Sequence, residues 1–216
     1  MKITLITEDS SVKLPFIKYG GKKIGKGINL AECEPLLSVL KEKNLKIPCD
    51  DYENENIYRK HLNSFVRPAK FMFAGRFSEV RDFYGYLNEK FHTNLFIISR
   101  RYGLLNAEEN IIPYDSHLDD YYSIKDLDKR TDFYNQLDKI VNDSDYVLLF
   151  LNKLLISYLI NNNFLKDTNR ITKLIFVTSK DFKKIIIDSN NIFFHRRGVA
   201  RIGKEKRKRI LEILEG

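Results

Sequence analysis

The sequence predicts an α/β fold: a mostly parallel, helix-flanked sheet of about five strands with a basic C-terminal helix. Short apolar runs alternate with helix-like segments at least four times along the 216 residues. Most of these runs are continuously apolar, which is typical of strands buried on both faces of a sheet. The last segment, residues 195–216, combines a helical pattern with many Lys and Arg side chains.

The N-terminal third gives the weakest signals. Residues 1–7 form a short run rich in β-branched side chains, which predicts a first strand. Asn29 is a candidate cap for a helix that ends near residue 43, because leucines recur there at helical spacing. Residues 57–65 predict a moderately amphipathic helix.

The rest of the chain alternates more regularly. We expect strands at 70–74, 95–99, 146–151 and 173–178, and a last strand or extended connection at 192–194. We expect helices at 78–91, from 131 or 132 to 141, from 152 to about 160, from a cap at Asp181 to about 187, and at 203–214. Residues 100–120 predict a loop with a short helix.

Composition favours one folded domain over residues 1–216, of which 43% are hydrophobic and 12% aromatic. The two cysteines, Cys33 and Cys49, form no CxxC pair, and no signal-like segment opens the chain. No apolar stretch is long enough to span a bilayer. We therefore expect a cytoplasmic protein without a membrane partner.

The net charge of +8 favours an anionic partner. In sheets of this kind, ligands bind at the carboxyl ends of the strands. One such position is Gly75–Arg76, between a predicted strand and a predicted helix. The glycine lets the backbone approach a ligand, and Arg76 offers a charge. A plain turn with Ser78 as helix cap explains the segment as well, and it is the favoured interpretation.

A second position is richer in polar side chains. Ser99, Arg100, Arg101, Tyr102 and Gly103 follow a predicted strand, and Pro113-Tyr114-Asp115 lies a few residues on. An arginine side chain can donate two parallel hydrogen bonds to a phosphate, and a tyrosine ring can stack on a base. Asp115 can accept hydrogen bonds from a base or sugar. Asp115 is also the candidate acid or base of a reaction. A structural loop turned by Gly103 and stiffened by Pro113 is an equal alternative.

The residues of this second position resemble the signature of a known protein family. Ser99, Tyr102-Gly103-Leu104-Leu105 and Pro113-Tyr114-Asp115 are similar to the signature of the YaaA-like proteins, over residues 99–115 and, with the flanking strands, about 70–118. This family includes peroxide-stress proteins and is distantly similar to a domain of archaeosine synthase. The resemblance implies an α/β fold distantly related to uracil-DNA glycosylases, nucleic-acid binding, and a role in DNA damage or base modification.

The C-terminal segment is the third candidate. It predicts a nucleic-acid-binding surface made of Arg196, Arg197, Arg201, Gly203, Lys204, Lys206, Arg207, Lys208 and Arg209. Ile202-Gly203-Lys204 also resembles the second half of a helix-hairpin-helix motif. The alternative is an amphipathic helix that docks through Ile210, Leu211 and Leu214 and exposes a solvated basic face.

The sequence shows no motif for a nucleotide cofactor or a zinc ion. The chain has no Walker A loop and no G-x-G-x-x-G, and its histidines have no zinc spacing, so no cofactor or metal is expected. The leading hypothesis is a nucleic-acid-binding protein with a nucleotide- or base-sized crevice. The alternatives are an enzyme that processes nucleotides or nucleosides, and a non-catalytic protein that docks on an acidic partner.

Overall fold

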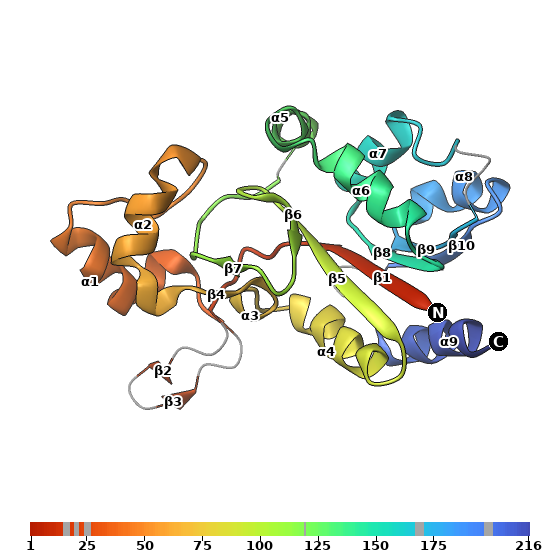
Figure 1. Cartoon of the computed structure of the whole chain (residues 1–216), viewed down its shortest axis with the longest axis horizontal. Helices are drawn as coiled ribbons and strands as arrows, with labels where there is room; N and C mark the ends of the chain where they lie inside the picture. The colour runs from red at the N-terminus through yellow and green to blue at the C-terminus, as the bar shows by residue number, and fades with distance from the viewer. Residues whose placement is uncertain (15–17, 20–21, 24–26, 119, 167–170, 197–200) are drawn as a thin grey trace.

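A mixed sheet forms the centre of the molecule (Figure 1). The computed structural model describes residues 1–14, 18–19, 22–23, 27–118, 120–166, 171–196 and 201–216. Within these residues, the sheet has six strands in the order β10-β9-β8-β1-β5-β6. The strands are β1 (Lys2–Glu8), β5 (His92–Ser99), β6 (Gly103–Asn106), β8 (Tyr146–Phe150), β9 (Lys173–Thr178) and β10 (Ile192–His195).

Five of the strands are parallel, and β6 pairs antiparallel with β5. The prediction of a mainly parallel α/β sheet is therefore confirmed. The prediction of about five strands misses β6, which lies in the segment expected to be a loop. Along the chain, β5 is added on one side of β1, and β8, β9 and β10 on the other. The strand order thus reverses at β1, and such a reversal opens a crevice at the carboxyl ends of the strands.

Helices cover both faces of the sheet. Odd-numbered residues of β1, such as Ile3 and Leu5, pack with α4 (Phe77–Asn88) and α9 (Lys204–Glu215). Ile6 points to the other face and packs with α5 (Tyr121–Thr131), α6 (Phe133–Asn142), α7 (Lys153–Asn161) and α8 (Lys183–Asp188). This arrangement buries the central strands on both faces, as their continuous apolar sequences predict.

A helical lobe lies beyond the carboxyl ends of β1 and β5, on the left of Figure 1. It holds α1 (Glu34–Glu42) and α2 (Glu55–His61), with the single turns η1 (Leu30–Glu32), η2 (Tyr52–Asn54) and η3 (Asn63–Phe65). Leu36 of α1 and Tyr58 of α2 belong to the same buried cluster as Ile3 of the sheet. The lobe therefore shares the hydrophobic core of the sheet.

Small elements complete the described structure. They are β2 (Lys18–Tyr19) paired with β3 (Lys22–Lys23), β4 (Arg67–Pro68) paired with β7 (Asn110–Ile111), the short α3 (Ala69–Met72) and the turn η4 (Lys180–Phe182). No helix in the described ranges is long and apolar enough to cross a membrane.

Several sequence predictions are corrected. The strand predicted at 70–74 is α3, after which Phe73 makes only a single bridge to Lys13. A five-residue apolar run fits a buried helical turn as well as a strand. The predicted helix from Asn29 is split: Asn29 caps η1, and α1 begins at Glu34 with Pro35 in its first turn. Helix α5 was not predicted, because only Ile124 and Leu127 are buried in its polar sequence.

Candidate functional site

The carboxyl end of β1 carries two acids that the sequence analysis did not single out. Glu8 and Asp9 are both more than nine-tenths buried. Glu8 accepts a hydrogen bond from the backbone N–H of Asn152, at the start of α7, and forms an ion pair of 2.8 Å with Arg196. Glu8 is the last residue of β1 and Asp9 follows it directly, so the rule that ligands bind at strand ends was the signal that could have found them.

A chain of hydrogen bonds ends on Asp9. The hydroxyl of Tyr114 donates to Asp9 Oδ2, and its oxygen lies 2.8 Å from Ser99 Oγ. The phenol has one proton, so Ser99 donates to Tyr114, and Ser99 Oγ accepts from the N–H of Tyr102 at 3.1 Å. Ser99, Tyr102 and Tyr114 therefore fix the orientation of a buried carboxylate.

The ring of Tyr114 is fully buried, which corrects the prediction that it stacks on a base. It packs edge-on against Phe73 and Tyr102. Lys13 is also fully buried. Its Nζ lies 4.6 Å from the centre of the Tyr114 ring and donates a hydrogen bond to the carbonyl of Ser10. Burial raises the pKa of the Tyr114 hydroxyl and lowers the pKa of the Lys13 amine.

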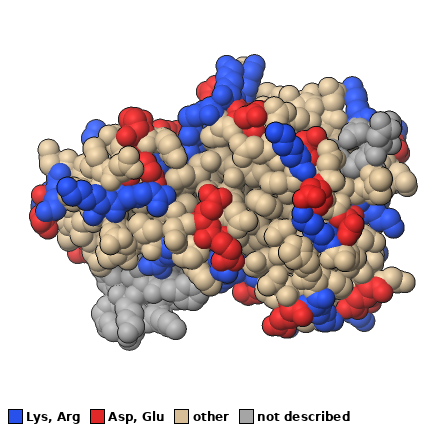
Figure 2. Space-filling view, in the orientation of Figure 1, with Lys and Arg blue, Asp and Glu red and all other residues tan. Residues whose placement is uncertain are grey.

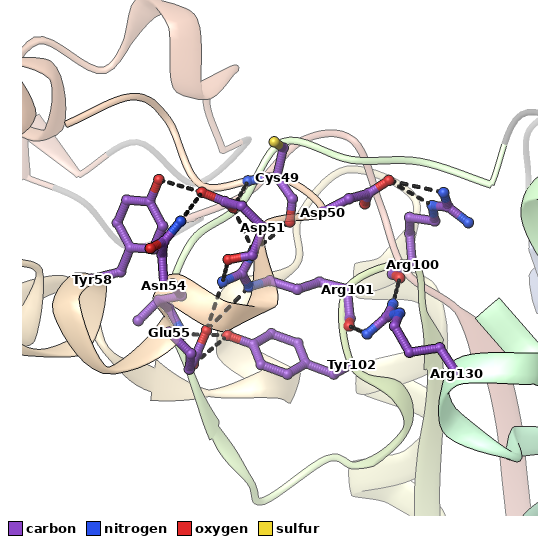
Figure 3. Close-up of polar contacts among 11 residues, drawn as sticks. Cys49, Asp50, Asp51, Asn54, Glu55, Tyr58, Arg100, Arg101, Tyr102 and Arg130 are labelled. Atoms are coloured by element: carbon purple, nitrogen blue, oxygen red, sulfur yellow. Dashed lines mark hydrogen bonds and ion pairs between the residues drawn. The ribbon is translucent and has the colours of Figure 1, made fainter. Parts of the chain in front are cut away.

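Arg100 and Arg101 enter an arginine network with Arg130, Asp50, Asp51 and Glu55 (Figure 3). Arg101 is fully buried. Its Nε and Nη2 donate to Glu55 Oε2 at 3.1 and 2.9 Å, its Nη1 donates to Asp51 Oδ1 at 3.0 Å, and Nη1 also donates to the carbonyl of Cys49. The phosphate contact predicted for Arg101 is therefore a structural contact between the sheet and the lobe.

The partners of Arg101 are held in the same network. Tyr102 donates to Glu55 Oε1 at 2.8 Å, and burial together with the charge of Glu55 raises the pKa of its hydroxyl. Burial opposes the ionisation of Asp51. Hydrogen bonds from Tyr58, from the N–H of Cys49 and from Arg101 outweigh this effect and lower the pKa of Asp51 to about 2.

Arg100 pairs with Asp50 at 2.8 Å, and its own backbone N–H donates to Asp9 Oδ2. Arg130 of α5 donates to the carbonyls of Arg100 and Arg101 at 2.9 and 2.8 Å. Gly103 begins β6 with a φ of +78°, and a Cβ there would lie 2.6 Å from Thr131 Oγ1. Helix α5 therefore packs so closely on this segment that position 103 requires glycine.

An open pocket of about 460 Å³ lies beside this network, and we call it the strand-end crevice. Its lining residues are Cys49, Asp50, Arg100, Asp115, Ser116, His117, Asp120 and Ser123. Asp115 is exposed there, and its Oδ1 lies 3.2 Å from His117 Nε2. Three carboxylates face one arginine, so the crevice favours groups that donate hydrogen bonds over a phosphate. The described residues contain no cluster of His, Cys, Asp and Glu suited to a metal ion.

The Gly75–Arg76 position is a turn on the surface. Gly75 has a φ of +62°, and Arg76 forms an exposed ion pair of 2.7 Å with Glu79. Helix α4 begins at Phe77, and the hydroxyl of Ser78 donates to Gly75 O instead of capping the helix. The carboxylate of Glu79 accepts from the backbone N–H groups of Arg201 and Ile202.

Three cations of the predicted basic surface, Arg196, Arg201 and Arg207, make contacts inside the protein. Arg201 is buried and donates to Thr7 Oγ1 at 2.7 Å, to Asp9 O at 2.6 Å and to Glu8 O. Arg207 donates to Glu79 O, and Arg196 pairs with Glu8. Arg197 lies outside the described residues. Glu79 accepts from the backbone N–H groups of Arg201 and Ile202, so these two groups of the segment that resembles a helix-hairpin-helix are not available to a phosphate.

The rest of the basic segment faces outward. Helix α9 runs along the sheet with Ile210 and Leu214 buried, as the docking interpretation predicts. Lys204, Lys208 and Arg209 are exposed and Lys206 is half-buried. Gly203 is the N-cap of α9 in extended conformation. On the face shown in Figure 2, basic and acidic side chains are interspersed.

Comparisons of the chain with protein-family models, with curated proteins and with solved structures found no match. The resemblance to the YaaA-like proteins therefore stays a prediction.

Proposed function

We propose that this protein binds nucleic acid, and that the outward-facing cations of α9 supply most of the affinity. The observation that carries the proposal is the group Lys204, Lys206, Lys208 and Arg209 on one helix. Within the described ranges, the only acid paired with any of them is Glu212, which lies 3.9 Å from Lys208 in an exposed pair. Unpaired cations clustered on one element are the usual footprint of a phosphate binder.

The way α9 is held supports this proposal. Arg201 fixes the segment before the helix to the end of β1, and Ile210 and Leu214 fix the helix to the sheet. The outward cations are therefore presented on a rigid element, so little ordering free energy is lost on binding. The YaaA-like signature at residues 99–115 implies the same class of partner.

The test is binding of fluorescent DNA and RNA oligonucleotides at several salt concentrations. The variant carries Lys204→Gln, Lys206→Gln, Lys208→Gln and Arg209→Gln. The matched control carries Lys41→Gln, Lys46→Gln, Lys125→Gln and Lys129→Gln, which remove the same charge from exposed positions elsewhere. We expect the α9 variant, and not the control, to flatten the plot of log Kd against log salt by about 3. If both variants lose the same amount of binding, the net charge of the protein and not the position of the cations sets the affinity. That result would contradict the proposal.

A second candidate function rests on the strand-end crevice. Its volume of about 460 Å³ is in the usual range for small-molecule sites, and Asp115 and Arg100 both line it. We infer a ligand rich in hydrogen-bond donors, such as a nucleobase or nucleoside, which Asp115 would bind or process. Calorimetric titration with nucleosides tests this, with Asp115→Asn expected to weaken binding at least tenfold. Unchanged binding in that variant would exclude the crevice.

A further inference from the structure

A groove of about 620 Å³ lies at the β10 edge of the sheet. Strands β9, β8 and β1 separate β10 from β5, so this groove is distinct from the strand-end crevice. We call it the basic groove, and its lining residues are Lys180, Lys183, Phe193, Phe194, His195, Glu205, Lys206 and Arg209. The sequence analysis assigned no role to Lys180, Lys183 or Phe193.

The basic groove has cations on two sides. Lys180 and Lys183 come from η4 and the first turn of α8, on one face of the sheet. Lys206 and Arg209 come from α9, on the other face, and their spacing of three residues places them on one side of that helix. Four cations therefore stand against the single carboxylate of Glu205. None of the four forms an ion pair within the described part of the chain.

Aromatic rings lie between these cations. Phe193 and Phe194 are neighbours in β10 and point to opposite faces of the sheet. Phe193 is half-buried, so part of its ring is accessible from the groove. The guanidinium of exposed Arg209 lies 5.3 Å from the centre of the Phe194 ring. An aromatic ring and a guanidinium held on a ring are both flat surfaces on which a base stacks.

We propose that the basic groove binds single-stranded nucleic acid, with phosphates against Lys180, Lys183 and Lys206 and bases stacked on Phe193 and Arg209. This proposal deepens the proposed function and rests on it. Bases in a duplex are already paired and stacked, so a ring between two rows of cations reaches only unpaired ones. An acidic peptide would satisfy the lysines, but it would leave the accessible face of Phe193 without a stacking partner.

The first experiment compares four ligands on the wild-type protein, and the two single strands have equal length and charge. The probes are a fluorescent oligothymidylate, the same backbone without bases, a duplex and polyglutamate. We expect the base-containing single strand to bind roughly tenfold more tightly than the base-free strand, because each stacked base contributes a factor of this order or more. We also expect the duplex and polyglutamate to bind more weakly than the single strand.

The second experiment tests the groove residues. Phe193→Leu keeps an apolar side chain but removes the ring, and Phe193→Trp keeps a ring. We expect Phe193→Leu to abolish the preference for the base-containing strand and Phe193→Trp to retain it. Lys180→Gln with Lys183→Gln should weaken every nucleic-acid probe severalfold, whereas Lys125→Gln with Lys129→Gln on α5 should not. Thermal unfolding of each variant identifies any that folds poorly.

The outcomes separate the two proposals. If the base-free strand, the duplex or polyglutamate binds as tightly as the base-containing strand, the single-strand proposal is overturned. In that case, the proposed function survives only if binding to nucleic acid still depends on the α9 cations. If no probe binds in a salt-sensitive way, both proposals fail.

Discussion

At the scale of single residues, Gly103 gives the most local prediction. Its φ of +78° and the 2.6 Å from a built Cβ to Thr131 Oγ1 make alanine strained there. We expect Gly103→Ala to lower the free energy of unfolding by about 2 kcal/mol or more. Gly85 in α4 has open space around it, so Gly85→Ala should stabilise the protein by about 0.5–1 kcal/mol. Urea denaturation measures both, and a similar effect of the two substitutions would contradict the close packing of α5.

The buried guanidinium of Arg101 allows a comparison between two arginines. Arg101→Leu removes the buried cation that pairs with both Asp51 and Glu55, and Glu55 keeps only its pair with Arg59. We expect a loss of about 3 kcal/mol of unfolding free energy. Arg76→Leu breaks an ion pair in which the arginine side chain is 60% exposed, so a change of less than about 0.5 kcal/mol is expected. Denaturant titration decides between these values. Equal effects would mean that the arginine network does not join the lobe to the sheet.

The pKa of Asp51 predicts a pH dependence. Its folded-state value of about 2 lies below the ordinary value of 3.8. The ionised carboxylate therefore stabilises the fold fully above about pH 4, and this stabilisation is lost as the pH falls towards 2. Asp51→Asn should lower stability at pH 7 by about 2 kcal/mol, and the difference from wild type should shrink between pH 4 and 2. A difference that stays constant over this range would contradict the assignment.

Residue-level reasoning from the sequence found some of these positions and missed their roles. Ser99, Tyr102, Tyr114 and Arg101 were selected as candidates for ligand contacts, yet the structure buries three of them and uses all four in internal hydrogen bonds. Burial depends on which segments pack over a loop, and a single sequence does not contain that information. Asp9 was missed because the predicted strand ended at residue 7.

At the scale of elements, Arg201 joins the C-terminal segment to the end of β1. Arg201→Met removes three hydrogen bonds, to Thr7, Glu8 and Asp9, and should cost about 3 kcal/mol of unfolding free energy. The guanidinium of exposed Arg209 lies over the Phe194 ring, so Arg209→Met should cost about 1 kcal/mol or less. Limited proteolysis should cut residues 201–216 faster in the Arg201 variant alone. Resistance of that variant would show that α9 docks without Arg201.

The elements that the sequence predicted well are those whose apolar pattern is long or regular. Strands β5, β8 and β9 and helices α4, α6, α7 and α9 were each predicted within a few residues. The errors fall where tertiary contacts decide the conformation. Strand β6 forms because its four residues pair with β5, and α3 forms where a short apolar run gave no periodicity.

At the scale of the whole molecule, helices cover both faces of the sheet, and the two proposed sites lie towards its opposite edges. The β5 side carries the acidic strand-end crevice, and the β10 side carries the basic groove. Composition alone gave the net charge of +8 and the basic tail. It could not separate the cations that pair internally, such as Arg196 and Arg201, from those that remain available to a partner.

The central claim is that nucleic acid binds along α9 and the basic groove, and lysine footprinting tests it most directly. The protein is acetylated briefly with and without a saturating single-stranded oligonucleotide, and modification at each lysine is measured by mass spectrometry. We predict protection of Lys180, Lys183, Lys204, Lys206 and Lys208, and unchanged modification of exposed Lys41, Lys46, Lys125 and Lys129. Uniform protection of all nine lysines, or protection of the second group alone, would contradict the account.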